Sequence, residues 1–400
     1  MKRNRWGMAV AAVGIHISIG SVYAWSVLMG PVMTALEADI AAVQWTFSLA
    51  ILFLGMSAAF LGPTVERLGP RRSGLLSTLC FTAGLWGAAW AVDSGSLAAL
   101  YLAYGCIGGI GLGVGYITPV ATLMKWFPRH RGFATGLAVM GFGFAALVAG
   151  PVMQQLTAAF GVGRMFGIVG AAYAVVMGLS SLYLAPPPER AVAADAPVRP
   201  APDHSLTAAQ ALRTPTFYLI WTIFFINITC GIGMLSIAAP LARESVGMTA
   251  ADAAAFVGLL GLVNGAGRLA WASISDVIGR AATYLIFFGW QTVAYSRLAG
   301  AANEWEFCLW MAGIISCYGG GFAVLPAFLA ERFGLRYLSN IHGKMLTAWA
   351  AAGIAGPLLL STVRSATAGF GAALHVFTAL SLAALVLMAV IRRWPPHRAD

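Results

Sequence analysis

Apolar runs of roughly 20 residues or more, each ended by charged residues, constrain this chain more than any other feature of its sequence. Only 10% of its residues are charged, whereas a soluble domain has about one quarter. The chain therefore has too few charges to cover a water-facing surface, and a lipid bilayer must solvate it. Backbone polar groups in lipid have to be satisfied internally, so only helices or closed barrels can span the membrane. Continuous runs of this length fit helices rather than the shorter, alternating strands of a barrel.

Charged residues divide the chain into twelve predicted membrane-spanning helices. The basic N-terminal residues precede an apolar run that is too long for a cleavable signal peptide, so this run is taken as the first span. The expected spans are 6–33, 43–63, 73–92, 97–122, 132–158, 164–185, 215–241, 253–275, 281–300, 306–329, 339–363 and 369–391. The sequence thus predicts an all-α membrane protein.

A stretch rich in proline and alanine, 186–214, separates the first six spans from the last six. Such a composition is typical of a flexible linker. The expected organisation is therefore an N-terminal six-helix bundle (1–185), a cytoplasmic linker (186–214) and a C-terminal six-helix bundle (215–400). The halves also look like a repeat, because Pro119 recurs as Pro326 and Gly150-Pro151 as Gly356-Pro357 at an offset of about 206 residues. Transporters built from repeats bind substrate near the midplane, between the halves.

Basic residues are distributed unevenly between the predicted loops. With the N-terminus in the cytoplasm, 18 of the 24 Lys and Arg residues lie on that side, and four lie on the other. The positive-inside rule then predicts that both termini are cytoplasmic, in an integral membrane protein of the bacterial inner membrane. The basic excess borders the anionic leaflet, which explains the net charge of +10 without a nucleic-acid partner.

Arg268 is the charged residue that lies deepest in a predicted span. It is about 8 residues, or roughly 12 Å, from the inner end of its helix, where a basic side chain costs at least ~2.5 kcal/mol unless it faces water or a partner. The acidic residues all fall in or beside loops, so an incoming anion is the expected partner. A guanidinium offers a carboxylate two parallel hydrogen bonds. The alternative is that Arg268 pairs with backbone carbonyls or extends toward the inner interface.

Other polar and aromatic residues inside the spans are candidates for the same site. Asn264 precedes Arg268 by four residues and shares its helix face, although interhelical hydrogen bonding would also explain it. Tyr116 and Tyr318 can each donate a hydrogen bond to a carboxylate, or can be ordinary packing residues. Leu28 and Trp349 are candidate apolar walls for a short substrate, or are lipid or core contacts.

Proton coupling is less well defined by the sequence. Arginine does not release its proton at physiological pH, so His16 and His375 are the candidate proton carriers. Each is also explained as a neutral structural imidazole. Lys344 lies near the cytoplasmic end of its span and is expected to reach the interface rather than the site.

Three motifs resemble the major facilitator superfamily: GPTVERLGPRR at 62–72, its weaker copy DVIGR at 276–280, and KWFPRHRGFATG at 125–136. The resemblance implies a fold of two six-helix bundles that move around one central site. Loop charges are then expected to pair across the cytoplasmic ends and favour the inward-closed state, or simply to set topology. These are Glu66, Arg67, Arg129, Arg131, Asp276 and Arg280.

Three further stretches, 21–28, 264–268 and 346–349, resemble the oxalate–formate antiporter family and its monocarboxylate-transporter relatives. That resemblance implies a substrate-binding arginine at Arg268. Relatives that carry lactate with a proton often have an aspartate at the position of Asn264. The oxalate exchanger uses a second basic residue in its eleventh helix, where Trp349 aligns here, so a monoanion is favoured over a dianion.

The sequence therefore predicts a monomeric secondary transporter that moves a small monocarboxylate such as L-lactate with a proton. An oxalate–formate type anion exchanger is the nearest alternative, and a non-transporting receptor or scaffold is a second. The five cysteines lack metal-ligand spacing, so no metal or cofactor is expected. A membrane enzyme is disfavoured because no nucleophile–base pair or phosphate loop is evident.

Overall fold

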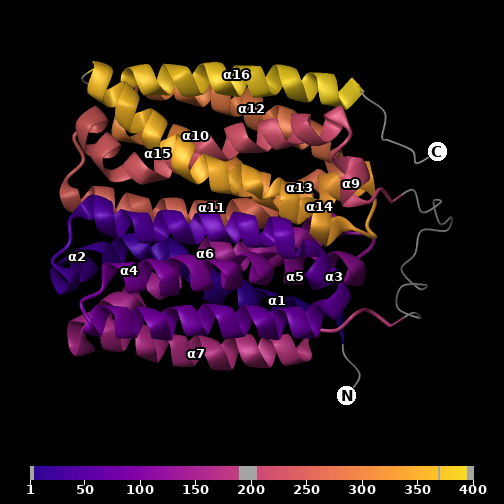
Figure 1. The fold of residues 1–400 in the computed structure, drawn as a ribbon. Coiled ribbons are helices and arrows are strands. Elements are labelled where there is room, and N and C mark those ends of the chain that lie inside the picture. The colour runs from indigo at the N-terminus through magenta and orange to yellow at the C-terminus, as the bar shows by residue number, and fades with distance from the viewer. Residues whose placement is uncertain (1–3, 189–204, 368–369, 394–400) are drawn as a thin grey trace.

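The computed structural model describes residues 4–188, 205–367 and 370–393, and the elements in these ranges are helical (Figure 1). Most of the predicted linker, 189–204, lies outside the described residues, as do the basic residues Lys2, Arg3, Arg190, Arg199 and Arg398.

The first half of the chain contains long helices with two irregular insertions. Its elements are α1 (Arg5–Ile19), a 3₁₀ stretch (Gly20–Ala24), α2 (Trp25–Leu36), α3 (Ile40–Asp93), α4 (Leu97–Leu100), a π-helical stretch (Tyr101–Gly108), α5 (Gly109–Trp126), α6 (Arg131–Phe160) and α7 (Val162–Tyr183). The second half contains α9 (Ala208–Ala211), α10 (Pro215–Val246), α11 (Ala250–Ile278), α12 (Arg280–Leu298), α13 (Glu304–Phe333), α14 (Leu338–Met345), α15 (Thr347–Thr367) and α16 (Gly371–Arg393).

Several of these helices begin at a side-chain cap. A short polar side chain before the first helical residue accepts a hydrogen bond from the backbone N–H three residues later, which satisfies one of the free donors of the first turn. The residues that do so are Asn4, Asp39, Ser96, Thr207, Thr214, Thr249 and Asn303.

The twelve predicted spans correspond to helices of the structure. Ten described helices are long and apolar enough to cross a membrane. One of them, α3, is two predicted spans joined at Gly69, whose φ of 73° would strain a residue with a side chain. The ninth predicted span is α12, which is less apolar and packs between α13 and α16. The prediction of an all-α membrane protein is confirmed.

Three of the predicted spans are interrupted. The first contains the 3₁₀ stretch Gly20–Ala24, the fourth contains the π-helical stretch Tyr101–Gly108, and the eleventh is broken at Leu346 between α14 and α15. By contrast, α6 and α15 run as helices through the Gly-Pro pairs at 150–151 and 356–357.

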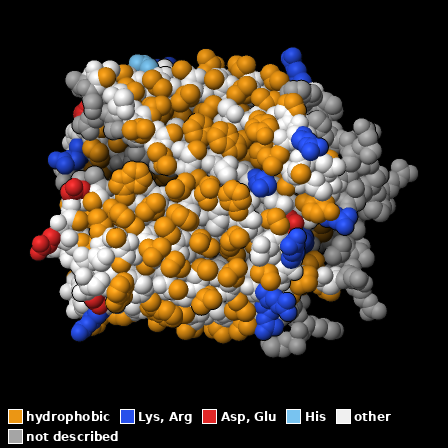
Figure 2. Space-filling model, in the orientation of Figure 1, with side chains coloured by type: hydrophobic (Ala, Val, Ile, Leu, Met, Phe, Trp, Pro, Cys, Tyr) orange, Lys and Arg blue, Asp and Glu red, His pale blue; other side chains and the backbone are white. Residues whose placement is uncertain are grey.

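The helices form two bundles, α1–α7 and α10–α16, that lie side by side (Figure 1). They meet where α6 packs on α11 and where α3 packs on α14 and α15. We use the term linker end for the end of the molecule at which α1 begins, α7 ends and α16 ends. The exposed surface is rich in large apolar residues such as Val277, Trp305 and Val10, and Figure 2 shows apolar side chains across its middle with several Lys and Arg toward the linker end. The molecule is an integral membrane protein.

Candidate functional site

Arg268 lies in α11 at the boundary between the bundles and is completely buried. Its Nε donates a hydrogen bond to Oδ1 of Asn264 at 3.3 Å. Among the described residues, its two terminal nitrogens have no hydrogen-bond partner, and no carboxylate forms an ion pair with it. A buried guanidinium whose two terminal donors have no partner has the hydrogen-bonding geometry that suits a planar anion.

Aromatic rings from both bundles surround this guanidinium. Its central carbon lies 4.8 Å from the ring centroid of Phe322 and 5.8 Å from that of Phe142. The indole of Trp349 packs on both rings, at 4.7 Å from Phe322 and 5.6 Å from Phe142. The rings stabilise the cation, and they make the surroundings of the guanidinium apolar.

Three tyrosines bring hydroxyl groups to the same region. The ring of Tyr116 lies 5.4 Å from that of Trp349, and its buried hydroxyl has no partner among the described residues. The hydroxyls of Tyr23 and Tyr318, which belong to different bundles, are 3.5 Å apart. Arg268 interacts electrostatically with all three phenols. Hydroxyl donors and one cation are therefore collected at the bundle interface.

The structure brings together most of the predicted site residues: Arg268, Asn264, Tyr116, Tyr318 and Trp349 lie in or beside this cluster. Leu28 is buried in α2, five residues after Tyr23. Sequence reasoning did not single out Tyr23, Phe142, Phe322 or His342. Tyr23 stood inside a quoted motif, whereas the two phenylalanines carry no signal in an apolar sequence.

The two predicted proton carriers have different surroundings. His16 in α1 is fully buried, and its ring lies 5.4 Å from that of Tyr116. His375 is exposed on α16 and does not join the central cluster. Lys344 donates a hydrogen bond to the carbonyl of Ala59 at 3.3 Å and lies over the ring of exposed Phe60. This agrees with the expectation that Lys344 reaches away from the site.

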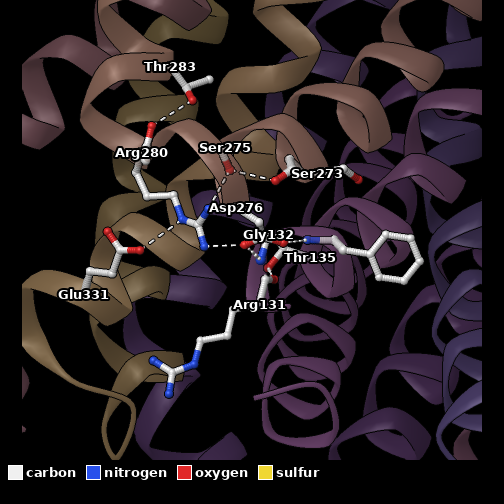
Figure 3. A network of polar contacts seen from close by, with 12 residues as sticks. Arg131, Gly132, Thr135, Ser273, Ser275, Asp276, Arg280, Thr283 and Glu331 are labelled. Atoms are coloured by element: carbon white, nitrogen blue, oxygen red, sulfur yellow. Dashed lines mark hydrogen bonds and ion pairs between the residues drawn. The ribbon is translucent and has the colours of Figure 1, made fainter. Parts of the chain in front are cut away.

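At the linker end, Asp276 joins the two bundles. Its carboxylate accepts hydrogen bonds from the backbone N–H groups of Gly132 and Phe133, at 3.0 and 2.9 Å, in the first turn of α6 (Figure 3). An anion is favoured there because the first N–H groups of a helix have no partner within the helix. The positive end of the helix dipole also lies at the N-terminus. Arg280 pairs with Asp276 and, at 3.1 Å, with Glu331, all three within the second bundle.

Glu66 makes the corresponding contact from the first bundle to the second. Its Oε1 accepts a hydrogen bond from the backbone N–H of Asn340 at 3.1 Å, in the first turn of α14. Arg67 and Arg129 are exposed, and Figure 3 shows the Arg131 guanidinium directed away from Asp276. The carboxylates thus bridge the bundles by capping helices.

Two helical bundles with apolar outer surfaces, and between them a buried arginine that forms no ion pair with any described residue, have the architecture of a polytopic membrane transporter. The chain belongs to the Major Facilitator Superfamily, which it matches over residues 11–357. It is 29% identical to the oxalate:formate antiporter of Oxalobacter formigenes over 96% of this chain and 92% of that protein. It is 22% identical to apicoplast pyruvate carrier 1 of Toxoplasma gondii over 99% of this chain and 91% of that protein. The human organic anion transporter MFSD10 has the same fold, with a TM-score of 0.73, 15% identity and coverage of 97% of this chain and 100% of that chain.

Close packing at Gly143 sets the position of Arg268 and is testable. A Cβ atom at Gly143 would lie 2.7 Å from Cα of Gly265 and 3.1 Å from Cδ of Arg268. Because backbone cannot yield easily, we expect Gly143→Ala to cost about 1–3 kcal/mol of stability. Thermal unfolding in detergent should show a lowered Tm. The control is Gly167→Ala in α7, where a Cβ would meet nothing within 4 Å; equal effects of the two variants would refute the packing argument.

Proposed function

We propose that this transporter carries a small monocarboxylate of the L-lactate or pyruvate class together with a proton, by alternating access. The observation that supports this most is the completely buried Arg268, whose two terminal nitrogens are without partners among the described residues. A carboxylate fits both donors at once. It also neutralises a charge whose burial is otherwise costly.

The arrangement around Arg268 favours a small substrate with one negative charge. Arg268 holds the carboxylate, and Tyr116, Tyr318 and Asn264 supply hydrogen bonds to it or to a substrate hydroxyl. Trp349 and Leu28 bound the space for a short alkyl group. A dicarboxylate would need a second cation, and Lys344 is engaged by Ala59 outside the cluster.

The two capping carboxylates give the linker end a role in the transport cycle. Glu66 and Asp276 hold the bundles together there, so we assign the described state as closed at the linker end. The excess of basic residues at this end supports a cytoplasmic placement of both termini in a bacterial inner membrane. We also propose an N-terminal bundle over 1–185, a linker over 186–214 and a C-terminal bundle over 215–400. The transporter is proposed to work as a monomer.

An oxalate–formate type exchanger is the second candidate. Similarity to the Oxalobacter oxalate:formate antiporter over 96% of the chain favours it. In that case the same Arg268 site would bind either anion, and no proton site would be needed.

Uptake of radiolabelled L-lactate into proteoliposomes separates the two candidates. At one proton per lactate, an inward gradient of about one pH unit should concentrate lactate about tenfold, and an uncoupler should abolish this accumulation. Preloaded oxalate should not replace the gradient. If lactate fails while preloaded oxalate or formate drives rapid exchange, the proton-linked proposal is wrong and the exchanger proposal takes its place.

A further inference from the structure

Two buried imidazoles, one from each bundle, lie next to Tyr116. The ring centroid of Tyr116 is 5.4 Å from that of His16 in α1 and 5.9 Å from that of His342 in α14. His16 is 0% exposed and His342 is 2% exposed. Among the described residues, the Nε2 atoms of both rings lack a hydrogen-bond partner. Structural histidines in a core normally have such partners, so this pair calls for a functional explanation.

The hydrogen bond of His16 indicates where its proton lies. Nδ1 of His16 is 3.2 Å from the carbonyl oxygen of Ala12, which can only accept. Nδ1 therefore carries the hydrogen of the neutral ring, and Nε2 keeps a free lone pair. This nitrogen is available to take up a proton.

The position of His342 makes the pair dependent on the conformation of the transporter. α14 belongs to the second bundle but packs on α3 and α5 of the first, and Tyr116 belongs to α5. When the bundles separate at the linker end, α14 leaves α3 and α5. His342 then moves away from Tyr116 and His16, so the pair exists only while the linker end is closed.

We infer that His16 and His342 form the proton-binding site of this transporter, with Tyr116 beside both and with one proton held by the pair while the linker end is closed. The inference rests on the proposed function and deepens it by naming the groups that bind the coupled proton. Opening of the linker end divides the pair and releases the proton on that side.

Charges around the pair explain why the proton and the carboxylate travel together. Tyr116 from α5 lies beside both imidazoles, and Arg268 from α11 acts electrostatically on His16. Tyr23 from the 3₁₀ stretch and Tyr318 from α13 lie one step further away, where Tyr23 acts on Tyr116 and contacts Tyr318. On the linker side, Glu66 and Lys344 are engaged with Asn340 and Ala59. Arg268 is the charged group that acts on His16 from within the cluster.

Arg268 makes proton binding conditional on the anion. With no anion bound, a proton on His16 would place a second buried positive charge near Arg268, which low polarity makes costly. A bound carboxylate neutralises Arg268 and removes this repulsion. The anion therefore binds first and the proton second. The empty carrier and the carrier holding both ions have the same net charge, so both can reorient, whereas the carrier with a proton alone is excluded.

Glutamine variants of the two histidines test the site, with His375→Gln as the matched control because His375 is exposed on α16. In purified form, His16→Gln/His342→Gln should still bind lactate, because the anion binds first and Arg268 is unchanged, but without the proton the loaded carrier cannot reorient. The double variant should lose the accumulation of about tenfold that a gradient of one pH unit supports in the wild type. An internal pH dye should record about one proton per lactate for the wild type and for His375→Gln, and none for the double variant.

A second measurement covers the case in which the double variant does not fold. Imidazole nitrogen NMR of the wild-type protein should show two of the six histidines changing toward the protonated form when lactate is added. Arg268→Ala should abolish this change. Unchanged histidine signals, or a folded double variant that accumulates lactate normally, would refute the proton site while leaving lactate transport intact. If the wild type binds no lactate at any pH, the proposed function is wrong and the inference falls with it.

Discussion

Arg268→Ala is expected to lower the affinity of the transporter for L-lactate by at least ~30-fold. Removing one member of a buried, hydrogen-bonded charge pair costs about 2–5 kcal/mol, because the substrate carboxylate would then be buried without a partner. Binding of lactate to the purified protein in detergent measures this directly, and initial uptake rates in proteoliposomes should fall in parallel.

Two further variants sharpen this experiment. Arg268→Lys keeps the charge but loses the planar pair of donors, so it should recover only part of the affinity. Lys344→Ala removes a cation that contacts Ala59 outside the cluster and should bind lactate as the wild type does. If lysine restores full affinity, the site recognises charge alone. If Lys344→Ala is the more damaging change, the anion is bound elsewhere.

Asp276→Ala is expected to move the population toward the state that is open at the linker end. The change removes both hydrogen bonds to the first turn of α6, and the loss of a helix cap costs about 0.5–2 kcal/mol, which alters a conformational equilibrium by about 2- to 30-fold. Spin labels at exposed Lys125 and Arg336, one in each bundle, should report a larger share of long distances across the linker end.

The control for the Asp276 variant is Ser273→Ala, one turn earlier in α11. The Ser273 hydroxyl donates only to the carbonyl of Leu269 within its own helix, so its loss should leave the distance distribution unchanged. After the change at Asp276, Arg280 still forms its ion pair with Glu331. The variant therefore does not leave Arg280 without an ion-pair partner. Identical distributions for both variants would mean that Asp276 does not hold the bundles together.

The sequence was sufficient for the number and order of the spans because each one is a physical requirement of the bilayer. Charges at 66–72 and 276–280 marked the boundaries between spans correctly, at the kink of α3 and at the junction of α11 with α12, and the apolar runs between such charges became helices. The irregular stretches were not predictable in the same way. Gly20–Ala24 and Tyr101–Gly108 have the composition of their flanking helices, so their departure from α-helical geometry arises from packing between helices that are distant in the chain.

The buried charge of the candidate site could be predicted from the sequence, whereas its phenylalanine residues could not. Arg268 stood out because an ionised group inside an apolar run has a large energetic cost, and Asn264 followed from the helical repeat. Phe142 and Phe322 could not be recognised, because aromatic residues are common in lipid-facing and interior positions alike. His342 was missed because it stands between Arg336 and Lys344, where the sequence suggests a membrane interface rather than a buried α14.

The breaks in the first and eleventh spans have a consequence for the speed of transport. Gly20–Ala24 carries Tyr23, and Leu346 separates His342 from Trp349, so each bundle has an interruption of regular helix beside the substrate. Leu346 keeps a hydrogen bond from its N–H to the carbonyl of His342 and accepts one from the N–H of Ala350, so the α-helical pattern is distorted there and not absent. Bending at a point where the helix is already irregular disturbs fewer well-formed hydrogen bonds than bending a continuous helix, so these two points lower the barrier to reorientation.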